Sequence, residues 1–353
     1  MNKTILIIGT GTIGGPLIGL VADFKNKIGV NKVLFHKRTP LDYEVSKVNN
    51  FIDRGALLVT DTNKIQQFRN HGHNVYCDMQ SALDEADVII DCTPAGNENK
   101  MNFYSEVAKK YPNKIFIAQG SEKGFGIPYA HGINDIALRD NKFIQVVSCN
   151  THNIACLLKT IPQNVESIID SDFVCIRRAN DISQSDGYIP SPVVSKHSDL
   201  EFGTHHARDA YDLFTTIDQK IPIFSSAMKL NTQYMHAMRF TITTSNKVLL
   251  EDVKKRIRKN MFAATTKYPD AGRIFSFGRD HGYYGRILNQ TVIVEDTLFV
   301  RSVKDNTKIT GFVYTPQDGN SLSSSVAAAM HALHKDHVNE YMSPFYKYLF
   351  RQI

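Results

Sequence analysis

The feature that most constrains this chain is a glycine motif that directly follows its first apolar segment. Thr4–Ile8 (TILII) is a wholly apolar run of the kind that forms a buried parallel strand. Gly9–Gly14 follows as GTGTIG, a GxGxxG motif, and apolar residues then recur at helical spacing as far as Phe24. Because the motif stands between a strand and a helix, it favours a dinucleotide-binding turn over an ordinary glycine-rich turn.

Each glycine has its own role in such a turn. Gly9 permits the tight turn, Gly11 lets the backbone approach a pyrophosphate, and Gly14 lets the helix pack closely on the strand. The helix start then offers unpaired N–H groups to the phosphates.

The same stretch, Ile5–Ala22, carries no charge and superficially resembles a signal or membrane segment. Its glycines, Pro16 and the charges that follow it disfavour export and membrane insertion.

The end of the predicted second strand, Lys32–Phe35, indicates which dinucleotide is bound. NAD-selective sites usually place a carboxylate at such a tip, about 20 residues after the glycines. Here the strand runs into His36-Lys37-Arg38-Thr39, so no carboxylate occupies the tip. Lys37 and Arg38 suit the 2′-phosphate of NADP, whereas a solvated loop is the alternative. We therefore expect NADP or NAD as cofactor, with NADP favoured.

The alternation of strands and helices continues through the first half of the chain. Further strands are expected at Leu57–Val59, Asp87–Asp91, Ile115–Ala118 and Phe143–Val147, with helices over 63–70 and 81–86. Ligands of an open parallel sheet bind beyond the carboxyl ends of its strands. The small polar segments Thr93–Gly96 and Gln119–Ser121 are therefore expected to contact the cofactor.

A candidate nucleophile lies where the strand ending at Val147 meets the next helix. Ser148-Cys149-Asn150-Thr151 precedes an apolar stripe at helical spacing, so Cys149 falls at a helix N-terminus with Ser148 or Asn150 as the cap. A helix N-terminus favours the thiolate, which is the nucleophilic form. A buried structural cysteine is the alternative. Cys156 is expected in the core, and Cys92 is a weaker candidate for a reactive thiol.

Motifs in the same order along nearly the whole chain resemble those of archaeal-type (type II) phosphorylating glyceraldehyde-3-phosphate dehydrogenase. Ser148–Thr151 is similar to that family's active-site SCNT, and Gly9–Gly14 to its GxGTIG. The other similar segments are Lys37–Glu44, Asp91–Gly96, Gln119–Lys123, Arg177–Asp181, His205–His206, Tyr234–His236 and Gln317–Asp318. The shared order makes the resemblance specific.

The resemblance implies an enzyme that oxidises glyceraldehyde 3-phosphate reversibly with inorganic phosphate, in glycolysis or gluconeogenesis. Cys149 would attack the aldehyde to give a hemithioacetal and then a thioester, and His236 would be the base. Without the resemblance, His236 would be interpreted as an interior histidine. The substrate would contact Ser148, Asn150, His205 and His206, and the cofactor would contact Thr12, Ile13, Gly120, Arg178 and Gln317. Arg177 and Thr151 can add donors for the two anionic reactants.

Strand pattern and resemblance together predict an α/β fold with two domains. An N-terminal Rossmann dinucleotide-binding domain would span 1–148 and be joined by a C-terminal helix over 319–353. An α+β catalytic domain with a mixed or antiparallel sheet would span 149–318. The resemblance also implies a homotetramer. The five cysteines form no CxxC pair, and 353 residues need no disulfides to stabilise a core, so we expect the cytoplasm.

Neither nucleic acid nor a metal is an expected partner. The net charge of +6 is mild for this length. The densest basic cluster, Val253–Asn260, carries apolar residues at helical spacing and is typical of a solvated helix face. His331, His334 and His337 lie on a predicted helix, but their spacing does not hold all three on one face, so no metal site is expected.

Some positions depart from the family pattern and bear on substrate choice. His152 and Asn153 replace a threonine and a glycine after the nucleophile motif, and Ala207-Arg208 replace residues that tend to be Gly-Pro after the paired histidines. Segment 127–139 is also divergent. Two alternatives therefore stay open: a related aspartate-semialdehyde or N-acetylglutamyl-phosphate reductase, and a non-catalytic dinucleotide-binding protein.

Overall fold

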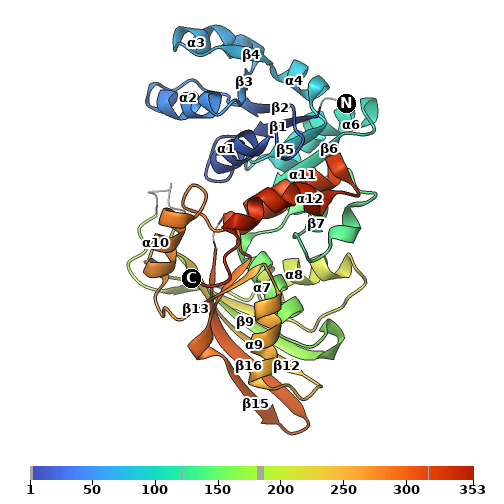
Figure 1. Cartoon of the computed structure of the whole chain (residues 1–353), viewed down its shortest axis with the longest axis vertical. Helices are drawn as coiled ribbons and strands as arrows, with labels where there is room; N and C mark the ends of the chain where they lie inside the picture. The colour runs from blue at the N-terminus through green and yellow to red at the C-terminus, as the bar shows by residue number, and fades with distance from the viewer. Residues whose placement is uncertain (1–2, 121, 181–186, 317) are drawn as a thin grey trace. The chain divides into compact units, whose positions relative to one another are not determined.

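The chain forms two compact units, each assembled from three stretches of sequence. The computed structural model describes residues 3–120, 122–180, 187–316 and 318–353 (Figure 1). The first unit comprises residues 1–129, 137–146 and 324–346, and the second comprises 130–136, 147–323 and 347–353. Both units therefore contain segments that are distant in sequence.

The first unit is built on a parallel sheet in the order β4-β3-β2-β1-β5-β6-β8-β7. Its strands are β1 (Thr4–Ile8), β2 (Lys32–His36), β3 (Leu57–Thr60), β4 (Val75–Asp78), β5 (Val88–Asp91), β6 (Ile115–Gln119), β7 (Ile127–Tyr129) and β8 (Phe143–Val146). The chain leaves β1 toward β2 on one side and later returns to β5 on the other. Rossmann sheets bind dinucleotides in the crevice where the strand order reverses in this way. The predicted α/β Rossmann architecture is confirmed.

Helices cover both faces of this sheet. They are α1 (Gly14–Phe24), α2 (Val45–Asp53), α3 (Ile65–Asn70), α4 (Met79–Glu85), α5 (Gly96–Asn99), α6 (Ser105–Lys110), α12 (Val338–Met342) and most of α11 (Gly319–His334). Leu6 and Ile8 pack with Leu83 of α4 on one face. On the other face, Phe35 of β2 meets Phe51 of α2 edge to face. The near-continuous burial of the strands is the pattern of a sheet covered on both sides.

The C-terminal helix is shorter than the predicted 319–353. Helix α11 ends at His334, and α12 and a 3₁₀ turn over Ser343–Tyr348 follow it. The chain turns between these elements through a hydrogen bond from the His337 amide to the His334 carbonyl, and Pro344 lacks the amide hydrogen that a continuous helix would use. Helix α11 is nevertheless fixed to the first unit, because Gln119 Nε2 donates to Ser325 Oγ at 2.8 Å.

The second unit contains a mixed sheet in the order β10-β11-β9-β12-β16-β14-β13, with β15 paired to β16. Its strands are β9 (Ile168–Arg177), β10 (Val193–Val194), β11 (Phe224–Lys229), β12 (His236–Thr244), β13 (Ala263–Thr266), β14 (Thr291–Val294), β15 (Phe299–Val303) and β16 (Asn306–Thr315). Strand β12 is antiparallel to both of its neighbours, β9 and β16, whereas β11 is parallel to β9. The predicted α+β fold with a mixed sheet is confirmed.

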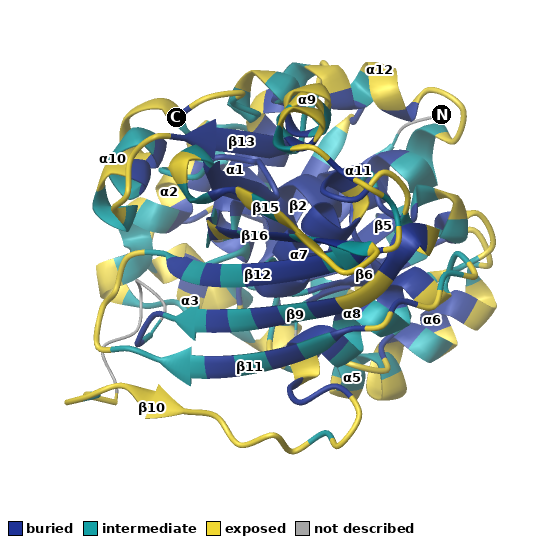
Figure 2. Cartoon of the chain, turned by 90° about the horizontal axis from the view of Figure 1, so that it is seen from below, coloured by how far each residue is buried: buried dark blue, intermediate teal, exposed yellow. Residues whose placement is uncertain are grey.

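One face of this second sheet carries the core. Helices α7 (Cys149–Thr160), α8 (His205–Thr215) and α9 (Leu250–Lys259) pack on it, and α10 (Ala271–His281) lies at the end bearing β13 and β14. Figure 2 shows the alternation of buried and partly exposed residues along β9 and β12. Phe173, Met238 and Phe240 point into the helices. The N-terminus of α7 holds the predicted nucleophile, and the N-terminus of α8 holds the two histidines predicted to bind the substrate.

Candidate active site

Cys149 is the first residue of α7, as predicted. Ser148 is the N-cap, and its Oγ lies 3.4 Å from the Thr151 amide nitrogen and 2.9 Å from Thr151 Oγ1. Fully buried Asn320, which the sequence analysis did not single out, donates from Nδ2 to the Cys149 carbonyl at 3.0 Å. These hydrogen bonds fix the backbone around Cys149. Its half-buried thiol lies at the positive end of a twelve-residue helix.

A buried threonine joins this helix to the strand that carries His236. Thr315 Oγ1 lies 3.2 Å from Asn150 Oδ1 and accepts a 2.8 Å hydrogen bond from Asn153 Nδ2. In the pairing of β12 with β16, Thr315 stands opposite His236. Asn150 and Asn153 therefore anchor the start of α7 at the sheet position where β12 begins. No local pattern in the sequence marks Thr315 as a site residue.

His236 is buried and its ring is oriented by the backbone. The amide N–H of Arg178 donates to His236 Nδ1 at 2.9 Å. Burial, followed by the neighbouring charges of Arg178 and Arg177, lowers the pKa of His236 to about 3. The ring is therefore neutral at physiological pH, and because Nδ1 accepts a hydrogen bond, its proton is on Nε2.

The paired histidines begin α8. His205 is exposed and His206 is buried, and their ring centroids are 3.9 Å apart. Neither ring nitrogen of His206 has a hydrogen-bond partner among the residues that the structure describes. Burial, then the charges of His205, Arg177 and His236, keeps the pKa of His206 well below its ordinary value. A neutral, buried ring with unused nitrogens is suited to bind a polar ligand.

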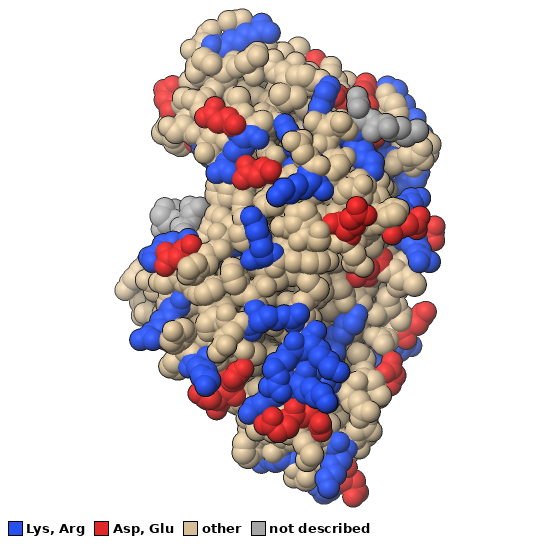
Figure 3. Space-filling view, viewed as in Figure 1, with Lys and Arg blue, Asp and Glu red and all other residues tan. Residues whose placement is uncertain are grey.

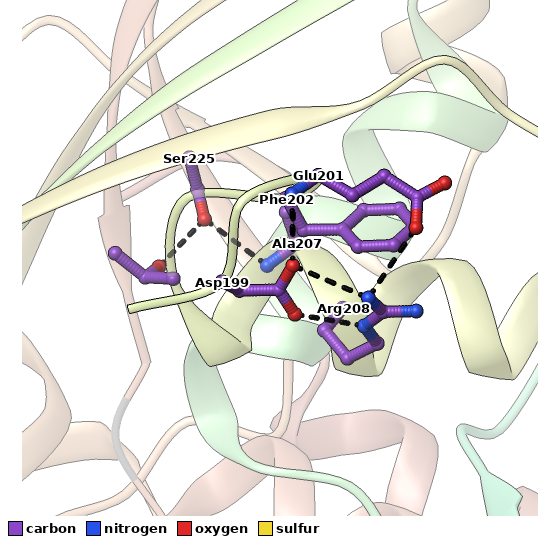
Figure 4. A network of polar contacts seen from close by, with 7 residues as sticks. Asp199, Glu201, Phe202, Ala207, Arg208 and Ser225 are labelled. Carbon is purple, nitrogen blue, oxygen red and sulfur yellow. Dashed lines mark hydrogen bonds and ion pairs between the residues drawn. The ribbon is translucent and has the colours of Figure 1, made fainter. Parts of the chain in front are cut away.

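Arg208 holds the loop before α8, as Figure 4 shows. Its guanidinium contacts Asp199 at 2.9 and 3.2 Å, contacts Glu201 at 3.4 Å, and stacks 3.8 Å from the ring centroid of Phe202. Ser225 Oγ accepts from the Ala207 amide at 3.1 Å. Ala207 and Arg208, which depart from the family pattern, therefore stabilise the start of the helix that bears the histidines.

The other departure, His152, is fully buried in α7. Its Nδ1 lies 3.0 Å from the Ser148 carbonyl oxygen. Burial lowers the pKa of His152 to about 4. The ring is therefore a neutral hydrogen-bond donor within the helix and adds no charge that would change near neutral pH.

The turn after β1 has room for a dinucleotide. A Cβ at Gly14 would lie 2.1 Å from the Gly9 carbonyl oxygen, so helix and strand approach too closely for any side chain. Gly9 has a φ of 93°, which favours glycine. A Cβ at Gly11 would meet no atom within 4 Å, and the same holds for Gly120 at the tip of β6. The Gly15 amide donates to the Gly11 carbonyl at 2.9 Å and no side chain caps α1, whose N-terminus would attract a phosphate. These features fit a dinucleotide.

The tip of β2 differs from the sequence expectation that no carboxylate occupies it. The turn Asp42–Glu44 brings Glu44 back against Lys37, which is buried and forms an ion pair with it, and Lys47 binds the same carboxylate at 3.0 Å. Partial burial raises the pKa of Glu44, but the hydrogen bonds from Lys37 and Lys47 outweigh this and leave the pKa below its ordinary value. Arg38 remains exposed.

Comparisons with known proteins identify the family. No protein-family model matches the chain. Curated relatives named glyceraldehyde-3-phosphate dehydrogenase do match. The one from Sulfolobus acidocaldarius is 32% identical over 307 residues, which are 84% of this chain and 83% of the relative. The chain belongs to the archaeal-type glyceraldehyde-3-phosphate dehydrogenase family. Relatives of the same name from Methanocaldococcus jannaschii and Metallosphaera sedula are 25% and 26% identical, over 85% and 84% of the chain and 86% and 84% of their own lengths.

Membership of this family confirms the prediction of an oxidoreductase and of a nicotinamide dinucleotide as cofactor. Of the residues predicted for the dehydrogenase site, Ser148–Thr151, Arg177, Arg178, His205, His206 and His236 come together in the second unit. The glycines of the first turn, Lys37, Arg38, Thr93 and Gly120 belong to the first unit. Gln317, Ser121 and Asp181 lie outside the described residues.

Two further predicted positions of this dehydrogenase have their side chains engaged within the protein. Thr93 donates from its amide and its hydroxyl to Asp91 Oδ1 at 2.8 and 2.6 Å, so both groups are engaged within the protein at the β5 tip. Burial, and then the Asp91 carboxylate, raises the pKa of the Cys92 thiol far above its ordinary value. Cys92 is therefore not a reactive thiol at neutral pH.

The remaining sequence features have structural explanations. Helix α9 buries Val253 and Ile257, and its lysines and arginines gather on the face shown in Figure 3. His334 stacks on Tyr341 and contacts Lys3. Among the described residues, no cluster of three or more histidine, cysteine, aspartate or glutamate side chains could hold a metal ion. None of the described helices has the length and apolar character needed to cross a membrane.

Proposed function

We propose that the chain catalyses the NAD(P)-dependent, phosphorylating oxidation of D-glyceraldehyde 3-phosphate to 1,3-bisphosphoglycerate, reversibly, in glycolysis and gluconeogenesis. The observation that carries this proposal is the junction at Thr315, which joins the Cys149 helix to the first residue of the His236 strand. The names of the curated relatives support the same reaction. The first unit would act as the dinucleotide-binding domain and the second as the catalytic domain.

The proposed chemistry begins at Cys149. Its thiolate, at the start of α7, would add to the aldehyde carbon and form a hemithioacetal. Nicotinamide dinucleotide, when bound, accepts the hydride that this carbon loses. The resulting Cys149 thioester would then be attacked by inorganic phosphate, which releases the acyl phosphate and the thiolate. The resemblance gives His236 the role of base, and its place opposite Thr315 supports direct action on the substrate oxygen.

Donors for the two anionic reactants lie in the same unit as this nucleophile. We assign the substrate and the attacking phosphate to Ser148, Asn150, Thr151, Arg177, His205 and His206. Arg177 is half-exposed and carries the fixed positive charge, whereas buried His206 is neutral and would donate or accept a hydrogen bond. These groups would therefore bind the anions through one positive charge and several neutral hydrogen-bond donors.

The cofactor would lie against Gly9, Gly11, Thr12, Ile13, Gly14, Lys37, Arg38, Thr93, Gly120, Arg178 and Gln317. We propose that NADP is favoured over NAD. Lys37, Arg38 and Lys47 carry three positive charges against the single charge of Glu44, which suits a 2′-phosphate. Lys37 would exchange part of its bond to Glu44 for the phosphate.

We also propose that the chain works in the cytoplasm as a homotetramer. The outer face of the β15–β16 hairpin exposes Phe299 and Phe312, and the segment near β10 exposes Val193 and Val194. Such apolar side chains are typical of surfaces that other copies cover. Light scattering coupled to gel filtration would test this, with four times 39.8 kDa as the expected mass.

An assay of aldehyde oxidation tests the proposed reaction. The chain is supplied with glyceraldehyde 3-phosphate, NADP or NAD, and phosphate, and reduced cofactor is followed by absorbance. We expect turnover that requires phosphate or arsenate and is lost in Cys149→Ala but not in Cys77→Ala, a matched change at a half-buried thiol of the first unit. Turnover of aspartate semialdehyde instead would support the related reductase. Full activity of Cys149→Ala would contradict the proposal.

A further inference from the structure

Three buried side chains form a hydrogen-bond network next to the nucleophile. Asn150 and Asn153 are three positions apart in α7, so they lie on the same side of the helix, and Thr315 is the last residue of β16. Asn153 Nδ2 donates to Thr315 Oγ1 at 2.8 Å, and the Thr315 hydroxyl donates to Asn150 Oδ1 at 3.2 Å. Each of the three residues is at most 3% exposed, so water has little access to replace either bond.

The network has a direction, because a threonine hydroxyl carries one proton. An amide NH₂ group can only donate, so Thr315 Oγ1 accepts from Asn153 and its own proton is left for Asn150 Oδ1. With Oδ1 turned toward Thr315, the Nδ2 group of Asn150 is turned away from it. Nδ2 has no hydrogen-bond partner among the residues that the structure describes. Asn150 therefore has N–H donors left for a ligand.

The opposite direction would give Asn150 the opposite chemistry. Thr315 would then donate to Asn153 Oδ1 and accept from Asn150 Nδ2, which would leave the carbonyl oxygen of Asn150 to face a ligand. In the observed direction, Asn153 Oδ1 is buried without a partner in the described part of the chain. In the reversed direction, Asn153 Nδ2 would lose its bond instead. Since Asn153 has an unsatisfied group either way, the functional difference between the two directions is the group that Asn150 presents.

We propose that Thr315 and Asn153 are positioning residues that hold the Asn150 amide as a hydrogen-bond donor to an anionic oxygen of the reactants. The inference rests on the proposed function, in which Asn150 binds the substrate or the attacking phosphate. Both reactants are anions, so a donor attracts them and a carbonyl oxygen repels them. Thr315 and Asn153 act through Asn150 and touch neither reactant. Asn153, which stands where the family pattern has glycine, thereby receives a role in this chain.

Two substitutions at Thr315 test the hydroxyl. Thr315→Val keeps the shape of the side chain but removes the hydroxyl, so the amide of Asn150 loses the bond that orients it. Thr315→Ser keeps the hydroxyl. A hydrogen bond to a charged group typically strengthens binding by about 10–100-fold. We therefore expect Thr315→Val to raise the KM for an anionic reactant about 10–100-fold with kcat changed by less than about threefold, and Thr315→Ser to keep that KM within about threefold.

The reactant whose KM rises identifies the oxygen that Asn150 binds. A higher KM for glyceraldehyde 3-phosphate assigns the oxygen to the aldehyde substrate, a higher KM for inorganic phosphate assigns it to the attacking group, and either result supports the proposal. Unchanged KM values for both reactants in Thr315→Val would overturn it. So would a Thr315→Ser variant that is as impaired as Thr315→Val, because the hydroxyl would then not be the group that matters.

Asn153 is tested against a matched asparagine on the same helix. In Asn153→Ala the Thr315 hydroxyl can still donate to Asn150, but nothing fixes its direction, so we expect the same KM to rise less than in Thr315→Val. Asn260→Ala is the control, because Asn260 Nδ2 donates to Thr160 Oγ1 at 2.7 Å near the other end of α7. We expect that control to leave both KM values unchanged. Equal KM values in Asn153→Ala and the unchanged protein would overturn the role of Asn153.

The hydroxyl proton can also be located without an assay. Neutron diffraction from crystals of the deuterated protein shows where each deuterium lies. We expect the deuterium on Thr315 Oγ1 to point at Asn150 Oδ1, and both deuterium atoms on Asn150 Nδ2 to point away from Thr315. A Thr315 deuterium directed at Asn153 would overturn the proposal even if no variant folded.

The outcomes distinguish this inference from the proposed function. If the unchanged protein oxidises no glyceraldehyde 3-phosphate with either cofactor, the proposed function fails and the assigned role fails with it, whatever the neutron result. If the protein does oxidise the aldehyde and Thr315→Val, folded by circular dichroism, keeps both KM values, only the positioning role is overturned. A raised KM in Thr315→Val, its recovery in Thr315→Ser and the expected deuterium position together support both.

Discussion

Arg208 contacts Asp199 through two nitrogens of its guanidinium group, at 2.9 and 3.2 Å, while its flat face covers Phe202. Asp199 Oδ1 also accepts from the amides of Glu201 and Phe202 at 3.1 Å. One side chain on α8 therefore fixes the loop that leads into the helix. Two-point binding of a carboxylate by arginine restrains geometry more than a single contact does.

We predict that Arg208→Lys raises the KM for glyceraldehyde 3-phosphate severalfold and changes kcat little. Lysine retains the charge but loses the two-point contact and the stacking on Phe202, so His205 and His206 become less well positioned. Steady-state kinetics checks this, with Lys109→Ala, which removes the exposed pair with Glu106, as the matched control. An unchanged KM would show that the clamp does not position the histidines.

The same pair predicts a feature of acid unfolding. The hydrogen bond from Arg208 is the main cause that lowers the pKa of Asp199 to about 2, from about 3.9 in an unfolded chain. Because the folded pKa is the lower one, the stabilisation is fully present above the unfolded pKa and is lost as the pH falls through the folded pKa, between about pH 4 and pH 2. The free energy of unfolding, measured with urea at several pH values in this range, should therefore depend less steeply on pH in Asp199→Asn than in the unchanged protein. Identical slopes would contradict the assignment.

Two glycines of the first turn should respond differently to alanine. Gly14→Ala would place its methyl group 2.1 Å from the Gly9 carbonyl oxygen and should destabilise the fold by about 1–3 kcal/mol. Gly11→Ala meets no protein atom within 4 Å and should leave the melting temperature unchanged. Its methyl group would occupy space that the pyrophosphate needs, so the Kd for NADP should rise at least about tenfold. Fluorescence titration measures the Kd for NADP, and thermal unfolding measures the stability. Tight binding of NADP by Gly11→Ala would show that the turn is not part of the cofactor site.

Glu44 should limit the preference for NADP. Its replacement by Gln removes the charge that holds Lys37, so the affinity for NADP should rise about three- to tenfold while that for NAD changes little, in keeping with the loss of one salt-bridged charge. Lys37→Ala combined with Arg38→Ala should have the opposite effect and weaken NADP far more than NAD. Isothermal titration with both cofactors checks the two variants. Equal losses for NADP and NAD in the double variant would refute this account of the β2 tip.

Iodoacetamide should modify Cys149 before the other cysteines. Burial is the main cause that raises the pKa of Cys77 to about 11 and those of Cys156 and Cys175 to about 12, and it also raises that of Cys92. At pH 7 these four thiols are protonated and react slowly. Peptide mass spectrometry after limited alkylation should find one label, on Cys149, and activity should fall in proportion. A first label on Cys92 would contradict the assignment of the nucleophile.

Local patterns in the sequence predicted the secondary structure that places the nucleophile. The apolar run before Gly9 and the helical spacing after Ser148 depend only on neighbouring residues, and both predictions are confirmed. The short strands Val75–Asp78 and Ile127–Tyr129 were not predicted, because they lie at sheet edges and lack a continuous apolar run.

The contacts that complete the site depend on residues distant in sequence, and no local pattern signals them. Thr315 and Asn320 lie more than 160 positions after Cys149, yet they bind Asn150 and the Cys149 carbonyl. Glu44 shows the same effect over a short interval. It is seven positions from Lys37, and only the turn at Asp42–Glu44 brings the two charges together.

The division of the chain has a consequence for synthesis on the ribosome. Residues 324–346 belong to the first unit, where Ser325 receives a hydrogen bond from Gln119 and Leu333 receives one from Lys3. The last helix can therefore dock on the amino-terminal sheet only after nearly the whole polypeptide has been translated. Until then the apolar surface that Ala327, Ala328 and Met330 will bury stays uncovered, and nascent chains truncated before Ser324 would be the forms that depend on a chaperone.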